Sequence, residues 1–87
     1  MTTSLPTPDV LTVYGASWCS DCHNTRRHLD DAGVEYRYVD LGLDRAAQAL
    51  LDDAGYRAIP VVVTTTGTIL VEPSERDLAA AVGIRAA

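Results

Sequence analysis

The only two cysteines of this 87-residue chain, Cys19 and Cys22, stand three positions apart, shortly after the hydrophobic run of residues 10–14. That run predicts a buried strand, and residues 20–32 predict a helix, so the pair falls where a strand gives way to a helix. Peptide dipoles and free N–H groups at a helix N-terminus favour a negative charge, which makes a cysteine there a nucleophilic thiolate. Two thiols at this spacing can form and break a disulfide with each other. The loop that such a disulfide closes is so small that it would constrain the unfolded chain little. The pair therefore predicts redox chemistry and not a structural staple.

The elements that must position the pair alternate between strands and helices. The first helix ends at Gly33, and a strand is expected over residues 34–41. A second helix begins after Asp44 and ends at Gly55. Pro60 cannot donate to a sheet ladder, so it should start the next strand. The remaining segments are a strand to Thr64, a hairpin turn at 65–67, a strand at 68–71 and a helix at 75–82 capped by Ser74.

This element order, βαβαββα, predicts an α/β protein with the thioredoxin fold. The first half should contribute a parallel pair of strands and the second half an antiparallel hairpin. The expected product is a four-stranded mixed sheet flanked by helices, with the cysteine pair at the end of the first strand.

Length and composition predict one small soluble domain. Hydrophobic residues make up 47% and charged residues 22%, and no apolar run approaches the ~20 residues that cross a bilayer. We expect a single domain over residues 1–87, with residues 1–9 as a short flexible leader. A formal net charge of −5 makes nucleic acid and anionic membranes poor partners. Residues 1–9 do not look like a secretory signal, so we expect a cytoplasmic protein, and a monomer.

Three separated features give the chain its resemblance to the glutaredoxin family over residues 10–83. The first is Val13-Tyr14 followed by Trp18 and the cysteine pair, and the second is Ile59-Pro60-Val61, where the family has its cis-proline. The third is the segment 67–70 followed by Pro73-Ser74 ahead of the last helix. Within the family the chain is most similar to the actinobacterial mycoredoxins. It also resembles the redoxins that reduce ribonucleotide reductase.

The resemblance implies a thiol–disulfide oxidoreductase that acts on disulfide-containing proteins or on mixed disulfides between a protein and a small thiol. Cys19, at the open end of the helix, should be the attacking thiol, and Cys22, one turn inside, the resolving thiol. A cis peptide before Pro60 would turn backbone groups toward an extended substrate, with Ile59 beside it. Trp18 is either a core side chain or a platform that flanks the sulfur.

Departures from the family pattern bear on the electron donor. Ser20 and Asp21 stand between the cysteines, where relatives commonly have Pro or Gly and an aromatic residue, and no lysine precedes the motif. Glutathione carries carboxylates that such a lysine would bind, whereas mycothiol does not need it. We therefore expect no tightly bound cofactor and a low-molecular-weight thiol as co-substrate, mycothiol in preference to glutathione. A thiol-disulfide reductase or a thioredoxin reductase is the expected partner enzyme.

Several alternative functions fit part of the pattern. The chain could be a redoxin reduced directly by thioredoxin reductase, or a glutaredoxin-like module that holds an iron–sulfur cluster between two protomers. His23 completes the C-x-x-C-H pattern of covalent haem attachment. The single methionine at position 1 and the predicted strands argue against a small cytochrome. A zinc site that also used His28 is disfavoured because side chains on one helix do not converge on a tetrahedron.

Overall fold

The structure, a computed structural model, describes residues 5–83 and contains the predicted order of elements. The elements are β1 (Thr12–Gly15), α1 (Ser20–Asp31), β2 (Arg37–Asp40), α2 (Arg45–Ala54), β3 (Val61–Val63), β4 (Ile69–Val71) and α3 (Glu75–Val82). The strands form one sheet in the order β2-β1-β3-β4. β1 and β2 are parallel, whereas β3 runs antiparallel to both β1 and β4. The predicted α/β fold with a four-stranded mixed sheet is thus confirmed.

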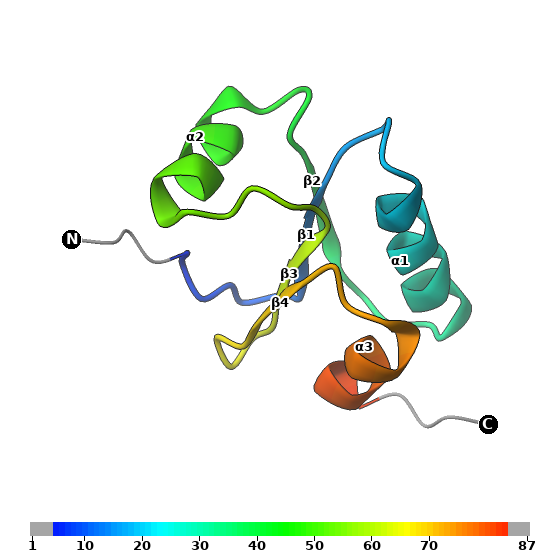
Figure 1. The fold of residues 1–87 in the computed structure, drawn as a ribbon. Helices are drawn as coiled ribbons and strands as arrows, with labels where there is room; N and C mark the ends of the chain where they lie inside the picture. Colours follow the sequence, from blue (N-terminus) through cyan, green and yellow to red (C-terminus); the bar gives the residue numbers. More distant parts are fainter. Residues whose placement is uncertain (1–4, 84–87) are drawn as a thin grey trace.

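Helices cover both faces of the sheet. In Figure 1, α2 lies on one side, and α1 and α3 lie together on the other. Because successive strand side chains point to opposite faces, the core is divided in two. Val13 and Val62 pack under α1 and α3, whereas Tyr14, Val61 and Val63 pack under α2. The near-continuous apolar strands of the sequence are therefore strands covered on both faces.

The predicted helix ends are largely confirmed, because local side chains satisfy the free backbone groups there. Asp44 accepts a hydrogen bond from the Ala47 N–H at 3.0 Å, and Ser74 accepts one from the Asp77 N–H at 3.1 Å. Gly55 ends α2 with a φ of 86°, a left-handed conformation that favours glycine. Ala32 and Ala81 are exposed although they continue the helical spacing of the apolar positions. Ala32 is the C-cap of α1 and Ala81 lies in the last turn of α3, so both stand at a helix C-terminus beyond the buried positions of the helix.

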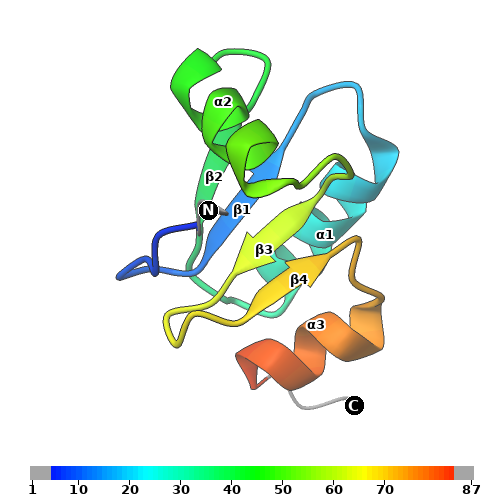
Figure 2. The same cartoon turned by 60° about the vertical axis from the view of Figure 1, so that its left-hand side comes forward.

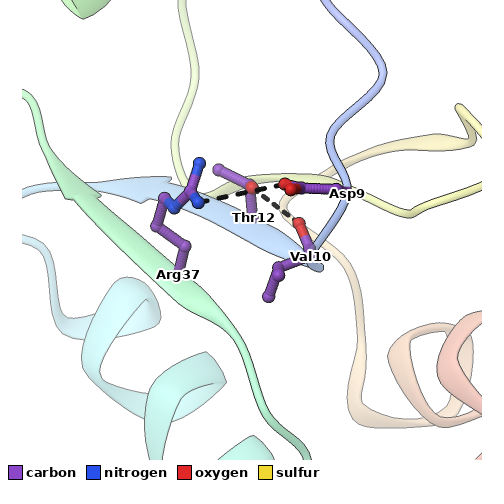
Figure 3. A network of polar contacts seen from close by, with 4 residues as sticks. All are labelled: Asp9, Val10, Thr12 and Arg37. Atoms are coloured by element: carbon purple, nitrogen blue, oxygen red, sulfur yellow. Dashed lines mark hydrogen bonds and ion pairs between the residues drawn. The ribbon is translucent and has the colours of Figure 1, made fainter.

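Residues 5–9 differ from the flexible leader expected at the start of the chain. Leu5 is only 6% exposed and belongs to the core under α2. Figure 3 shows one further tie of this segment, Arg37 on β2 lying 3.9 Å from Asp9, and beside it the Thr12 hydroxyl donates to the Val10 carbonyl at 2.9 Å. The ion pair is solvent-exposed and worth little, so burial of Leu5 is the main anchor. Sequence reasoning overlooked it because one leucine among prolines carries no periodic pattern.

The pairing of the strands decides where the cysteines lie. Tyr14 near the end of β1 pairs with Val61 at the start of β3, and Val61 pairs with Val71 at the end of β4. The loop into α1, the loop into β3 and the loop out of β4 consequently meet at one end of the sheet, as Figure 2 shows.

Within residues 5–83, none of the helices has the length and apolar character needed to span a membrane.

Candidate active site

Cys19 forms the N-cap of α1. Its backbone is extended (φ −100°, ψ 111°), and its sulfur accepts a hydrogen bond from the Cys22 N–H at 3.1 Å. A sulfur thus stands where an N-cap oxygen usually does, and it faces the positive end of the helix dipole. The side chain is only partly buried. Cys19 is therefore reachable from solvent, and a negative charge on its sulfur is stabilised by the helix.

Cys22 lies one turn further along α1 and is completely buried. Burial is the main reason that its pKa rises from 9.0 to about 12, and a hydrogen bond with the Cys19 thiol adds to the rise. A hydrogen bond with the backbone of Ala16 lowers the pKa, whereas charge on Cys19 and on Asp21 raises it further. At neutral pH Cys22 is a protonated thiol. The two cysteines, both unpaired in this structure, are chemically unequal.

The predicted cis peptide bond is present between Ile59 and Pro60. The Ile59 carbonyl accepts a hydrogen bond from the Cys19 thiol at 3.9 Å, so the loop into β3 lies against the sulfur, as expected. The Pro60 carbonyl accepts a second hydrogen bond, from the Glu72 N–H at 2.8 Å. Because Glu72 directly follows β4, the sheet itself holds this loop beside Cys19.

Trp18 is a surface residue with 72% of its area exposed, which rules out the core alternative. Its ring lies over Gly42: a Cβ added there would stand 2.9 Å from the ring. Trp18 and Ile59 border a cleft of about 330 Å³ between the cysteine loop and α2. The residues that line this cleft are Trp18, Leu41, Gln48, Leu51, Asp52, Tyr56, Arg57 and Ile59. The placement agrees with a platform that flanks the sulfur.

A second groove, of about 220 Å³, lies on the other side of the cis-proline, between α1 and the start of α3. Its lining residues are Asp21, Asn24, Thr25, His28, Pro60, Glu72, Pro73, Glu75 and Leu78. Three carboxylates and no lysine or arginine line this groove. Its field therefore opposes the binding of an anion near the cysteines.

Sequence reasoning missed two side chains that support the site. His23 donates from Nε2 to the Ser17 carbonyl at 2.8 Å and ties the cysteine loop to α1. Tyr38, on β2, has its hydroxyl at the space in front of Gly15 that the Cys22 sulfur also borders. The C-x-x-C-H spacing was a signal for His23, because it places the imidazole in the first turn. No local pattern pointed to Tyr38.

The guanidinium of Arg26, on α1, lies over the Tyr38 ring, 4.0 Å from the ring centroid. In the described part of the chain, no three His, Cys, Asp or Glu side chains gather where they could hold a metal ion.

Comparison with known families gives a match to the glutaredoxin family over residues 11–68, which is most of the chain and includes both cysteines and the cis-proline. The chain belongs to the glutaredoxin family. The family predicted from the three sequence features is confirmed, whereas the mycoredoxin subtype stays a prediction.

Relatives of this family member include a phage protein and bacterial redoxins. The Gene 56 protein of Mycobacterium phage D29 is 40% identical over 55 residues, which cover 62% of this chain and 61% of that protein. The glutaredoxin-like protein NrdH of Salmonella typhimurium is 34% identical over 53 residues, covering 61% of this chain and 65% of that protein. The chain thus matches somewhat less than two thirds of the length of these relatives.

Two solved structures share the fold. The glutaredoxin-like NrdH-redoxin of Escherichia coli matches with a TM-score of 0.73 and 21% identity, over 80% of this chain and 91% of that chain. A variant of the thioredoxin-like protein BC3987 matches with a TM-score of 0.79 and 24% identity, over 90% of this chain and 100% of that chain. Both confirm the arrangement of the sheet and helices.

The raised pKa of Cys22 predicts a loss of stability at alkaline pH. In the unfolded chain the thiol ionises near 9.0, whereas in the folded protein it keeps its proton to about 12. Between these values the unfolded state binds fewer protons, so the Cys22 contribution to the free energy of unfolding falls by at most about 1.4 kcal/mol per pH unit. Urea unfolding of the wild type and of Cys22→Ser from pH 7 to pH 11 would measure it. The serine variant should show a shallower decline above pH 9, and parallel curves would contradict this assignment.

Proposed function

We propose that the protein is a thiol–disulfide oxidoreductase in which Cys19 attacks and Cys22 resolves. The observation that carries this proposal is the pairing of two unequal thiols: one solvent-accessible at a helix N-terminus, the other buried and protonated one turn away. Membership of the glutaredoxin family supports the same chemistry.

The reaction proceeds in two exchanges. The Cys19 thiolate attacks one sulfur of a substrate disulfide, a Cys19–substrate disulfide forms, and the other substrate sulfur leaves as a thiolate. Cys22 then loses its proton and attacks Cys19, which releases the second substrate sulfur. The substrate gains two electrons, and the protein is left with a Cys19–Cys22 disulfide. A separate thiol or reductase must return the two electrons.

The surroundings of Cys19 suit an extended substrate. Trp18 and Ile59 supply apolar walls on one side of the sulfur, and the cis-proline loop presents backbone groups beside it. We assign Trp18, Ile59 and Pro60 to substrate binding, with disulfide-containing proteins as partners. These backbone contacts are independent of substrate sequence, so binding through them tolerates varied peptides.

The electron donor that we favour is mycothiol. The acidic groove beside Pro60, with Asp21, Glu72 and Glu75, disfavours the carboxylates of glutathione, and no lysine or arginine lines the groove to compensate. Mycothiol has no such carboxylates. An uncharged thiol can approach the Cys19–substrate disulfide without this repulsion.

A second donor is supported by the relatives. Several of them are NrdH proteins, and the Escherichia coli NrdH-redoxin has a thioredoxin-like activity profile. By analogy, a thioredoxin reductase would reduce the Cys19–Cys22 disulfide of this chain directly. The exposed Trp18 and its cleft offer a surface for such an enzyme.

The roles of the two cysteines differ most on a mixed disulfide between a protein and a small thiol. Cys19→Ser should abolish turnover, because no accessible sulfur remains. Cys22→Ser should keep measurable activity, because a free small thiol can replace the resolving sulfur. Steady-state reduction of a thiol-conjugated reporter protein by each variant tests this. Survival of activity in Cys19→Ser, or equal loss in both variants, would overturn the assignment.

The donor can be identified by supplying the oxidised protein with NADPH and one reducing system at a time. Mycothiol with its disulfide reductase should support the fastest loss of NADPH, ahead of glutathione with its reductase. Asp21→Asn should improve the use of glutathione by about two- to fivefold, the size of an exposed charge effect, and leave the use of mycothiol nearly unchanged. Asp31→Asn, at the far end of α1, is the matched control and should change neither rate.

Fast turnover with thioredoxin reductase alone, and slow turnover with both small thiols, would refute the mycothiol proposal in favour of the second donor. An unchanged glutathione rate in Asp21→Asn would show that the groove charge does not select the thiol.

A further inference from the structure

The hydroxyl of Tyr38 is a buried polar group that the redox chemistry described above does not use. Its oxygen is inaccessible to solvent and has no hydrogen-bond partner among residues 5–83. Buried polar groups are nearly always paired, so an unpaired one at a reactive centre calls for a reason. Tyr38 comes from the middle of β2, next to the strand that leads into the cysteine loop.

The hydroxyl and the sulfur of the resolving cysteine face one point in front of Gly15. A Cβ added to Gly15 would stand 2.9 Å from the Cys22 sulfur and 3.0 Å from the Tyr38 hydroxyl oxygen. Both atoms therefore border the same small space, which is open only because residue 15 has no side chain. The phenol and the thiol thus face the same point in front of Gly15 from two different elements, β2 and α1.

The attack of Cys22 on Cys19 requires the Cys22 thiol to ionise, and its surroundings disfavour the charged form. The thiol is fully buried, and charge on Cys19 and on Asp21 opposes its ionisation. The Ala16 backbone offsets part of this penalty. A further hydrogen-bond donor that engages only the ionised sulfur would lower the barrier to the resolving attack, because hydrogen bonds to charged groups are the strong ones.

Tyr38 has the properties of such a donor. Burial, followed by charge on Cys22 and on Asp40, raises its pKa above the ordinary value of 10.0, so the phenol keeps its proton at neutral pH. The Arg26 guanidinium, 4.0 Å above the ring, partly offsets this shift and polarises the O–H bond toward donation.

We propose that Tyr38 is a positioning residue for the resolving step and that its hydroxyl donates a hydrogen bond to the Cys22 thiolate as this attacks Cys19. The inference rests on the dithiol function proposed above. In the step, Cys22 releases its proton to solvent, the new bond joins the Cys22 and Cys19 sulfurs, and the bond between Cys19 and the substrate sulfur breaks. The substrate sulfur leaves with the electron pair, and Tyr38 keeps its proton throughout.

The resolving step can be isolated in a single turnover. Reduced protein is converted to the mixed disulfide of Cys19 with thionitrobenzoate, and release of the coloured thiolate is followed by absorbance over a range of pH. Tyr38→Phe should slow release by about tenfold or more, as expected for a lost hydrogen bond to a charged group. The apparent pKa of release should also move upward, which a purely structural role of the ring would not produce.

Tyr36→Phe is the matched control. Tyr36 lies two residues before Tyr38 in the chain, and its hydroxyl donates to Asp30 at 2.9 Å on the exposed surface. This variant should release thionitrobenzoate at the wild-type rate. Thermal unfolding of both variants checks that each remains folded, and Tyr38→Phe keeps the ring on which Arg26 stacks.

The outcomes separate the two proposals. If Tyr38→Phe releases thionitrobenzoate at the wild-type rate and with the wild-type pH profile, the role of Tyr38 is overturned. The dithiol mechanism then still stands, provided that the wild-type protein releases thionitrobenzoate normally. Release that persists in Cys22→Ser would overturn the dithiol mechanism itself. Equal slowing by Tyr36→Phe and Tyr38→Phe would also count against the specific role of Tyr38.

Discussion

The hydrogen bond from the Cys22 N–H to the Cys19 sulfur, 3.1 Å long, is the interaction on which the rest of the site depends. It begins α1 after the short loop that follows β1 and fixes the attacking sulfur at the helix N-terminus. The same helical turn carries the Cys22 side chain inward, where burial keeps it protonated. One N-cap thus makes two neighbouring cysteines chemically different. That difference is what an ordered sequence of two thiol exchanges needs.

The sheet supplies the second constraint, because it brings the cis-proline loop to the sulfur from a distant part of the sequence. Pairing of Tyr14 with Val61 places the loop before β3 opposite the end of β1. The Glu72 N–H then fixes the Pro60 carbonyl from the other side. Glu72 has a φ of 47°, an unusual conformation for a residue other than glycine. Such strain is retained where the surrounding structure holds it, here between β4 and the acidic groove.

Most of the fold followed from local chemistry in the sequence. The helix ends are formed by nearby residues: Asp44 and Ser74 cap helix N-termini, and Gly55 ends α2. These roles could therefore be predicted without knowledge of tertiary contacts. The cysteine pair was predicted from its spacing at a helix N-terminus and the cis-proline from the family resemblance, and the structure places them together. The choice of mycothiol as donor stays a prediction, as does the cytoplasmic location.

What the sequence did not reveal depends on contacts between distant segments. Tyr38 and Cys22 border the same space only because β2 pairs with β1 and residue 15 is a glycine. Trp18 was ambiguous because a tryptophan suits either a core or an exposed binding surface, and only packing of the loop decides. Leu5 was assigned to a flexible leader because its burial requires the assembled face under α2. In each case the deciding partner is remote in the chain.

The central claim is that the two thiols are unequal because the fold exposes one and buries the other. Brief treatment of the reduced protein with a limiting amount of iodoacetamide at neutral pH, followed by peptide mapping by mass spectrometry, tests this most directly. The reagent reaches an accessible sulfur and not a buried one, so the label should be found almost entirely on Cys19. Equal labelling of both residues, or preferential labelling of Cys22, would contradict the account.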